Sequence, residues 1–286
     1  MNLTNINEIK ELLSRHGFHF SKSMGQNFLT AAWVPQQIAE EAMLDENTGV
    51  IEVGPGIGCL TEQLSARAGK VVAVELDKAL KPVLKETLAG CGNVEIVFGD
   101  VLKQNLPQLV KEKFGDMRAC VCANLPYNVT SPLITAFLQA GCFDCITVMI
   151  QREVAKRICA RENTADYGAF TVLVQWYAEA EILFDVPPSC FIPQPKVTSS
   201  VIRLKLREKP PVEVKDRDVF FRVVRAAFGM RRKTLLNALS AHFGEISKEK
   251  LEEVIISSGF DAKIRGEALS IGEFATIADA ICKFLD

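Results

Sequence analysis

Three glycines and two acids have the types and spacing of a nucleotide site. The glycines, Gly54, Gly56 and Gly58, follow the apolar run VIEV in the order G-P-G-I-G, and glycine lets a ligand approach the backbone closely. Glu75 and Asp100 end the next two apolar runs, and Glu75 stands where doubly wound folds place a carboxylate for ribose hydroxyls. The pattern predicts an adenosine-containing cofactor, and the glycine spacing favours S-adenosylmethionine over NAD. A tight turn with surface acids is the simpler alternative.

The fourth apolar run ends in Asn124, Leu125, Pro126 and Tyr127, which could handle an adenine amine. That amine is a poor nucleophile because its lone pair is delocalised into the ring. The Asn124 side-chain oxygen and the Leu125 carbonyl could each accept one amine hydrogen and stabilise positive charge as the nitrogen attacks a methyl group. Pro126 would fix the turn, and Tyr127 would stack on the base for about 1–3 kcal/mol. An ordinary Asn-Pro turn is the alternative.

A second aromatic residue, Phe191, lies in the proline-rich loop at residues 186–195. A phenyl ring held between prolines would suit the other face of a base that has left its stack. The alternative role for Phe191 is to fill the hydrophobic core.

Short apolar runs separated by helix-length gaps would position all of these side chains. Such runs predict buried parallel strands in a doubly wound sheet, whose carboxyl ends meet at one edge. Two more runs, at 177–184 and 198–206, predict an antiparallel edge pair. The five parallel runs lie at 50–53, 71–76, 94–99, 119–124 and 146–150.

The rest of the chain predicts helices at both ends. Asn5 with Glu8 forms a capping box before a helix that Gly17 ends, and a second helix is expected at 34–43. A linker with paired prolines occupies 208–218. We therefore expect a sheet domain at residues 1–207 and a small α-domain at residues 208–286. The α-domain helices are expected near 219–228, 231–243, 248–257 and 272–285.

Composition excludes several classes of protein. With 286 residues, 48% of them hydrophobic and 24% charged, the chain is neither disordered, collagenous nor a small disulfide scaffold. It shows no signal peptide and no membrane-spanning run. The nine cysteines are scattered, and the chain has no second CxxC or HxxxH motif that could complete a metal site with Cys142 and Cys145. We expect buried free thiols, no metal site and a cytoplasmic location.

Taken together, the segments resemble the rRNA adenine dimethyltransferases, and within them the KsgA/RsmA group that acts on small-subunit rRNA. The resemblance covers nearly the whole chain, and the ordered set of motifs is specific where a lone glycine motif would be weak. The tail at residues 226–239 and 265–269 resembles the same group, whereas the related erythromycin-resistance methyltransferases lack this basic run. The matching motifs are residues 22–29, 52–58, Glu75, 99–101, 124–127 and 191–199.

The resemblance implies a class I methyltransferase, with a seven-stranded sheet, that makes N6,N6-dimethyladenosine at two adjacent adenines near the 3′ end of 16S rRNA. By the same match, Asn27 and the Leu29 backbone would cover the methionine part of S-adenosylmethionine. Gly54 would lie beneath the cofactor, Glu75 would bind its ribose, and Asp100 with Val101 would bind its adenine. Asn124 would touch cofactor and target base, and the base would lie between the rings of Tyr127 and Phe191.

Positive charge is concentrated although the chain as a whole is not basic. The 33 Lys and Arg are outnumbered by 35 acids, yet residues 196–233 carry twelve cations and four acids. A cluster of this kind predicts contact with RNA phosphates, while a solvated helix face is the usual meaning of any single charge. The candidate RNA contacts are Lys22, Arg152, Arg157, Lys196, Arg222, Arg225, Arg231, Arg232 and Lys233.

The leading hypothesis is therefore a monomeric cytoplasmic enzyme that methylates rRNA within a pre-30S particle, with no membrane partner. Three alternatives stay open from the sequence. They are a non-catalytic ribosome-assembly factor that keeps the fold, a methyltransferase of large-subunit rRNA, and an NAD-dependent oxidoreductase.

Overall fold

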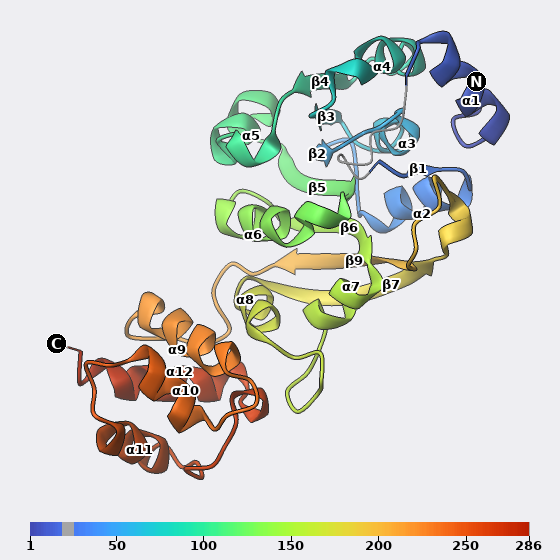
Figure 1. The fold of residues 1–286 in the computed structure, drawn as a ribbon. Helices are drawn as coiled ribbons and strands as arrows, with labels where there is room; N and C mark the ends of the chain where they lie inside the picture. The colour runs from blue at the N-terminus through green and yellow to red at the C-terminus, as the bar shows by residue number, and fades with distance from the viewer. Residues whose placement is uncertain (19–25, 286) are drawn as a thin grey trace. The chain divides into compact units, whose positions relative to one another are not determined.

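A seven-stranded, mostly parallel sheet organises the first part of the chain in the computed structural model, which describes residues 1–18 and 26–285 (Figure 1). The strand order is β4-β3-β2-β5-β6-β9-β7. Strands β2 to β6 pair in parallel, and β9 pairs antiparallel with β6. The strands are β2 (Thr48–Val53), β3 (Lys70–Glu75), β4 (Val94–Phe98), β5 (Arg118–Asn124), β6 (Cys145–Gln151), β7 (Ala178–Val186) and β9 (Ser199–Leu206).

All seven expected strands are therefore present, within a few residues of their expected ends. Every residue of β2 is buried, and buried strands of a parallel sheet appear in the sequence as short, mainly apolar runs. The chain steps outward from β2 to β3 and β4, and then returns to place β5 on the other side of β2. Ligands of open α/β sheets bind where the strand order reverses, beyond the carboxyl ends of the strands. That point lies between β2 and β5.

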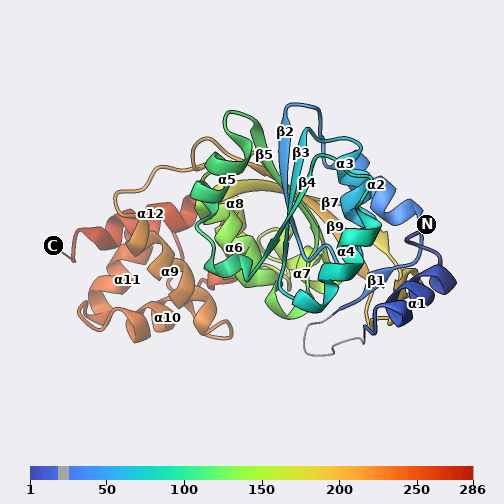
Figure 2. The same ribbon diagram turned by 90° about the horizontal axis from the view of Figure 1, so that it is seen from above.

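Helices cover both faces of this sheet. Helices α2, α3 and α4 lie on one face, and α5 and α6 lie on the other (Figures 1 and 2). Arg15 and His16, at the end of α1, both contact Glu86 of α4 at 2.7 Å. The helices are α1 (Ile6–Arg15), α2 (Trp33–Glu41), α3 (Cys59–Ser65), α4 (Lys81–Thr87), α5 (Leu106–Phe114) and α6 (Thr130–Ala140).

A two-stranded ribbon was not expected from the sequence. Strand β1 (Phe28–Leu29) pairs antiparallel with β8 (Phe191–Ile192), and Leu29 faces Phe191 in the register. Two-residue strands carry no periodic pattern, so only the tertiary structure reveals this pairing of segments more than 160 residues apart. The ribbon belongs to the same compact unit as the large sheet, Met1–Ala155 with Glu179–Leu206.

The second compact unit is helical and consists of Lys156–Ala178 and Arg207–Asp286. Its second stretch starts at Arg207, next to the expected boundary at 207/208, whereas its first stretch, Lys156–Ala178, was expected in the sheet domain. In that segment the Trp176 ring lies 4.7 Å from the Phe220 ring, and the Tyr167 hydroxyl donates to the Leu269 carbonyl. The helices that lie wholly in this unit are α8 (Ala169–Tyr177), α9 (Arg217–Gly229), α10 (Leu235–His242), α11 (Lys248–Ser257) and α12 (Ile271–Cys282).

Caps explain where these helices begin. Asp216 accepts from the backbone of Asp218 and Val219 and starts α9, and Ser270 forms the expected capping box with Glu273 at α12. Thr234 caps α10, so this helix starts four residues later than the expected 231. None of the helices in the described part of the chain has the length and apolar character needed to cross a bilayer.

Candidate functional site

The carboxyl ends of β2, β3 and β5 and the turn after β4 surround a cavity of about 230 Å³. Its lining includes the predicted residues Gly54, Gly56, Glu75, Asp100 and Asn124, which are distant in sequence and meet only because the strands are parallel neighbours. Gly58 is not part of the lining and instead starts α3. Other predicted residues that line the cavity are Asn27, Leu29, Val101, Leu125, Pro126 and Tyr127.

The glycine turn gives the cavity a backbone floor. Gly54, Gly56 and Gly58 have φ values of 66°, 60° and 93°, a region that L side chains rarely adopt. A Cβ built on Gly54 would meet no atom of the described residues within 4 Å, so among these residues the space that a side chain would take is open. On Gly58 the same atom would lie 2.9 Å from a Leu88 methyl group. Gly54 therefore leaves room for a ligand, and Gly58 leaves room for packing.

Two carboxylates lie at successive strand ends. Glu75 is buried and accepts a hydrogen bond of 2.7 Å from the Asp77 backbone amide; burial raises the pKa of Glu75, and backbone hydrogen bonds oppose that shift. Asp100 accepts from the Leu102 amide at 3.0 Å through Oδ1. Leu76 and Leu102 line the cavity beside the two acids with exposed apolar side chains. This rim offers carboxylate acceptors next to an apolar surface, which suits an adenosine.

Glu52 is a functional candidate that the sequence analysis did not select. It lies within β2, is 1% exposed and lines the cavity, and its Oε2 has no hydrogen-bond partner among the described residues. Burial raises the pKa of Glu52 to about 8; the Thr61 hydroxyl opposes this rise, and the charge of Glu75 adds to it. The sequence could have indicated this role, because Glu52 lies inside the buried run VIEV and burial of a carboxylate without a partner is unfavourable.

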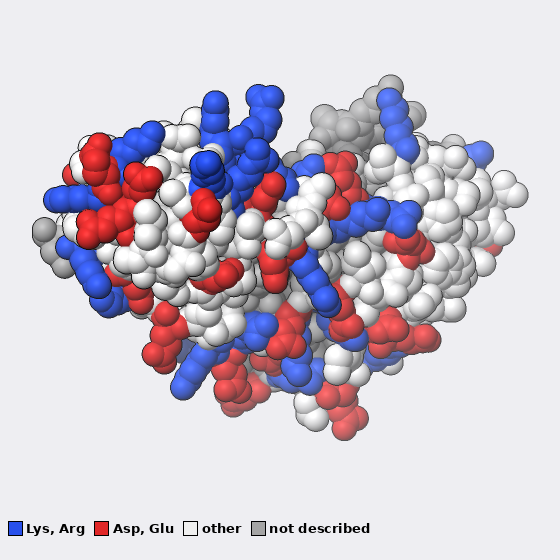
Figure 3. Space-filling model, turned by 90° about the horizontal axis from the view of Figure 1, so that it is seen from below, with Lys and Arg blue, Asp and Glu red and all other residues white. Residues whose placement is uncertain are grey.

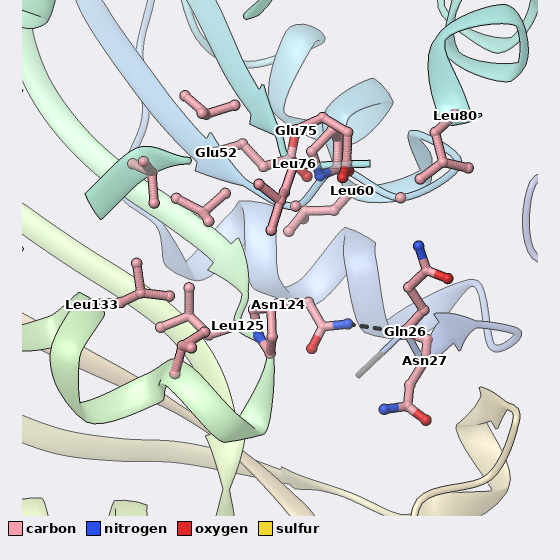
Figure 4. Close-up of a pocket in the computed structure, with 18 of the residues that line it drawn as sticks. Gln26, Asn27, Glu52, Leu60, Glu75, Leu76, Leu80, Asn124, Leu125 and Leu133 are labelled. Atoms are coloured by element: carbon pink, nitrogen blue, oxygen red, sulfur yellow. Dashed lines mark hydrogen bonds between the residues drawn. The ribbon is translucent and has the colours of Figure 1, made fainter. Parts of the chain in front are cut away.

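The Asn124 side chain is held in one orientation. Its amide nitrogen Nδ2 donates to the backbone carbonyl of Asn27 at 3.3 Å, which Figure 4 marks as a dashed line. The side-chain oxygen Oδ1 therefore points away from that carbonyl. The Leu125 amide donates to the Met149 carbonyl at 3.1 Å, and the Thr130 hydroxyl donates to the Pro126 carbonyl at 3.1 Å. These bonds fix the turn that carries Asn124 and Leu125.

The two predicted stacking residues lie in different surroundings. Tyr127 lines the cavity, and its hydroxyl shares a 2.6 Å hydrogen bond with the buried Ser199 hydroxyl. Phe191 is 2% exposed, does not line the cavity and packs in the hydrophobic core. The structure therefore brings Tyr127, and not the Phe191 ring, to the cavity.

The segment Gln26–Leu29, hereafter the N-terminal segment, forms one side of the cavity. Figure 4 shows Gln26 and Asn27 across from Glu52 and Glu75 and close to Asn124. Gln26 donates through Nε2 to Asp77 Oδ2 at 2.8 Å, a contact that the sequence analysis did not foresee.

The candidate RNA contacts differ in whether their side chains form ion pairs with acidic residues. Arg152 pairs with Asp185 at 3.3 Å, Arg222 with Glu245 at 2.6 Å, and Arg231 with Glu267 at 3.2 Å. Arg157 is exposed, and Lys22 lies outside the described residues. On the face shown in Figure 3, several Lys and Arg side chains stand together near the upper edge. The candidates that are exposed and form no ion pair with another described residue are Lys196, Arg225, Arg232 and Lys233.

The cysteines carry no disulfide, and those in and around the sheet strands are largely buried. Burial raises the pKa of the Cys59 and Cys120 thiols to about 12. These thiols are unreactive at neutral pH, as expected for core positions. In the described part of the chain, no three His, Cys, Asp or Glu side chains are grouped as metal ligands.

Comparison with known proteins places these motifs in one family. The family model for ribosomal RNA adenine dimethylase matches residues 17–283. The ribosomal RNA small subunit methyltransferase A of Alkaliphilus oremlandii is 48% identical over 96% of both chains. That of Geobacillus kaustophilus is 48% identical over 95% of this chain and 94% of its own.

Solved structures share the fold. A dimethyladenosine transferase from Plasmodium falciparum has a TM-score of 0.73 at 23% identity, covering 87% of this chain and 95% of its own. The 23S rRNA methyltransferase ErmE has a TM-score of 0.68 at 26% identity, covering 89% of this chain and 99% of its own. With the near full-length match of the family model, the chain belongs to the ribosomal RNA adenine dimethylase family.

Proposed function

We propose that this protein uses S-adenosylmethionine to dimethylate the N6 amines of two adjacent adenosines near the 3′ end of small-subunit (16S) rRNA. The observation that carries the proposal is the Asn124 side chain, held by the Asn27 carbonyl at the edge of a glycine-floored cavity. The 48% identity to small-subunit methyltransferases, which extends over nearly the full length of the chain, supports small-subunit rRNA as the substrate. The protein acts as a cytoplasmic monomer on a pre-30S particle.

The residues present fit S-adenosylmethionine, which supplies an activated methyl group when bound. Gly54 leaves a space that a Cβ would fill, so the cofactor can lie against the backbone. Glu75 offers a carboxylate to the ribose hydroxyls, and Asp100 with the Val101 backbone offers acceptor and donor to the adenine edge. The Glu52 carboxyl, whose Oε2 has no partner among the described residues, would ionise and pair with the ammonium group of the methionine part.

The residues after β5 handle the target amine. Asn124 Oδ1 and the Leu125 carbonyl each accept one amine hydrogen, which directs the nitrogen lone pair towards the methyl group. Because both acceptors are fixed before the base arrives, they stabilise the positive charge on the nitrogen without a reorganisation of the site. The Tyr127 ring, tied to Ser199, supplies a face on which the extruded base stacks. No strong general base is needed before the attack.

Ribose binding by Glu75 predicts a pH dependence. The pKa of Glu75 is raised by burial, and the ionised form is the better acceptor for two hydroxyl donors. We expect cofactor affinity to fall as the pH drops through this raised pKa. Glu75→Gln should bind about 10- to 100-fold more weakly at pH 8, since a hydrogen bond to a charged group contributes about 1.5–3 kcal/mol. The variant should also lose the part of the pH dependence that Glu75 contributes.

Isothermal titration with S-adenosylhomocysteine between pH 5 and pH 8 measures both effects. Asp116→Asn, an exposed neutralisation outside the cavity, is the matched control and should bind as the wild type does. Equal affinities of Glu75→Gln and wild type at pH 8 would remove Glu75 from the ribose site.

The exposed cations of the helical unit are proposed to grip RNA phosphates. Arg232 and Lys233 lie in the turn before Thr234 caps α10, where their side chains are exposed. The double change Arg232→Ala with Lys233→Ala should weaken binding of unmethylated small subunits about tenfold. It should also lower the slope of log affinity against log salt by about one for each phosphate that is no longer neutralised.

Filter binding at several salt concentrations measures both quantities. Lys248→Ala, which removes one exposed cation at the start of α11, should keep the wild-type slope. Arg222→Ala should lower the melting temperature instead, because Arg222 pairs with Glu245 and lies 4.0 Å from the Phe243 ring centroid. A double variant with an unchanged salt slope would exclude this turn from the RNA interface.

One experiment tests the proposed function as a whole. Unmethylated small subunits and large subunits are offered side by side with cofactor that carries a labelled methyl group. We expect two dimethylated adenosines in the small-subunit RNA and no label in the large subunit. Label in the large subunit would indicate the function named for ErmE, and binding of small subunits without label would indicate an assembly factor.

A further inference from the structure

The N-terminal segment contacts two sides of the cavity, one proposed to bind the cofactor and the other proposed to bind the target adenine. At its far end, β1 pairs with β8, and the Thr30 amide donates to the Cys190 carbonyl at 2.8 Å. At its other end, the neighbouring residues Gln26 and Asn27 contact the turns after β3 and β5. Gln26 reaches Asp77 at 2.8 Å, and the Asn27 carbonyl accepts from Asn124 at 3.3 Å. The segment therefore joins the turn after β3 to the turn after β5.

Asp77 is itself fixed to the ribose acid. Its backbone amide donates to Glu75 Oε1 at 2.7 Å, and its Oδ1 accepts from the Ala79 amide at 3.0 Å. With Oδ1 used as the cap of the short helix at Lys78–Leu80, Oδ2 receives the Gln26 amide. A continuous path of hydrogen bonds and one peptide unit thus runs from Glu75 through Asp77, Gln26 and Asn27 to Asn124.

The orientation of the Asn124 amide decides whether it can accept from an amine. A carboxamide has one acceptor end and one donor end of nearly equal shape, so packing alone does not distinguish them. In the structure the Asn27 carbonyl makes the distinction, because it takes the Nδ2 donor. A displaced Asn27 carbonyl would let the amide turn and present N–H groups to the N–H groups of the target. The position of that carbonyl depends on its neighbour Gln26.

We propose that the hydrogen bond from Gln26 to Asp77 positions the N-terminal segment, so that a ligand bound to Glu75 in the ribose site further stabilises the orientation in which the Asn124 amide accepts from the target adenine. The inference rests on the proposed function, since it assigns Glu75 to the cofactor and Asn124 to the amine. Gln26 and Asp77 act as positioning residues through their neighbours. They touch neither the methyl group nor the amine.

An exchange of chemical groups tests the contact without removing side-chain volume. Gln26→Glu places a carboxylate against the Asp77 carboxylate and should lower kcat about tenfold or more, with little change in KM for the small subunit. Asp77→Asn alone should have a smaller effect, because the Gln26 amide can turn its oxygen to the new donor. Gln26→Glu combined with Asp77→Asn restores one donor and one acceptor and should recover most of kcat.

Asparagine at residue 77 keeps the cap on Ala79, so the double variant leaves the short helix intact. Lys78→Ala, an exposed change at the next residue, is the control and should retain the wild-type kcat. A merely structural role would lower the melting temperature and would leave kcat of the folded enzyme unchanged. No recovery in the double variant, or a full kcat in Gln26→Glu, would overturn the proposal.

A second measurement is independent of methyl transfer. S-adenosylhomocysteine should slow backbone amide hydrogen exchange at residues 27 and 28 in the wild type and in the double variant, but not in Gln26→Glu. Equal slowing in all three proteins would overturn the coupling. A wild type that shows this exchange pattern but transfers no methyl group would contradict the proposed function and leave the coupling supported.

Discussion

We expect Asn124→Ala to lower kcat for methyl transfer about 100- to 1000-fold, because it removes one of the two preorganised acceptors proposed for the target amine. In the wild type, Nδ2 donates to the Asn27 carbonyl, so Oδ1 is the atom available to accept the amine hydrogen in the proposed mechanism. Its loss leaves the amine nitrogen with its lone pair delocalised into the ring and with only the Leu125 carbonyl to hold it. Single-turnover transfer with saturating cofactor and small subunits measures this loss at the chemical step.

Binding of small subunits to Asn124→Ala should stay at the wild-type level, because RNA affinity depends mainly on phosphate contacts. Asn128→Ala is a matched control in the same turn, since Asn128 is exposed and does not line the cavity. It should transfer methyl groups as fast as the wild type. If the two variants had equal rates, the role assigned to Asn124 would be wrong.

We expect Glu52→Gln to weaken cofactor binding about 200- to 5000-fold and, at the same time, to stabilise the protein without cofactor at alkaline pH. The affinity falls because a partner is removed from a buried charge pair, which costs about 3–5 kcal/mol. The gain in stability comes from the raised pKa of Glu52, about 8, which is above its ordinary value of 4.5. A carboxyl group with a raised pKa contributes fully below pH 4.5, and its contribution is lost as the pH rises through 8.

Melting curves of the protein without cofactor at pH 4 and pH 9 measure the effect on stability. Wild type and Glu52→Gln should melt alike at pH 4, where the carboxyl is neutral in both the folded and the unfolded protein. At pH 9 the variant should melt higher, by about 2–4 °C for each kcal/mol gained. Glu62→Gln, an exposed change on the neighbouring helix α3, should follow the wild type throughout. Parallel pH profiles for Glu52→Gln and wild type would show that Glu52 is not held in its buried state.

Much of the sheet could be predicted because buried parallel strands have a simple pattern in the amino-acid sequence. Each strand must be apolar on both faces, so each appears as a short apolar run, as Val71–Val74 does in β3. The site acids were predictable for the same reason. A polar residue that ends such a run, as Glu75 and Asp100 do, lies at the carboxyl edge by geometry alone. Caps with a defined pattern, such as Ser270 with Glu273, were equally visible.

Other features depended on contacts that no local pattern records. Helix α8 lies in an apolar stretch that runs directly into β7, so periodicity did not separate the two. Its partners, such as Phe220 for Trp176, are about 45 residues away in the sequence. The Phe191 ring was expected at the target base. It is instead buried in the core, where its strand β8 pairs with β1. Whether an aromatic side chain faces a cavity or a core is a property of the assembled chain.

The sequence by itself determined which runs form the sheet and which residues stand at the strand ends, and it indicated the class of cofactor, because these follow from residue types and their order along the chain. Only the tertiary structure decided which atoms of those residues are available. It placed the Asn27 carbonyl on the Asn124 amide nitrogen and left Glu52 Oε2 without a partner among the described residues. Hydrogen bonds between segments nearly 100 residues apart depend on distances of a few tenths of an ångström, which the packing of the folded chain sets.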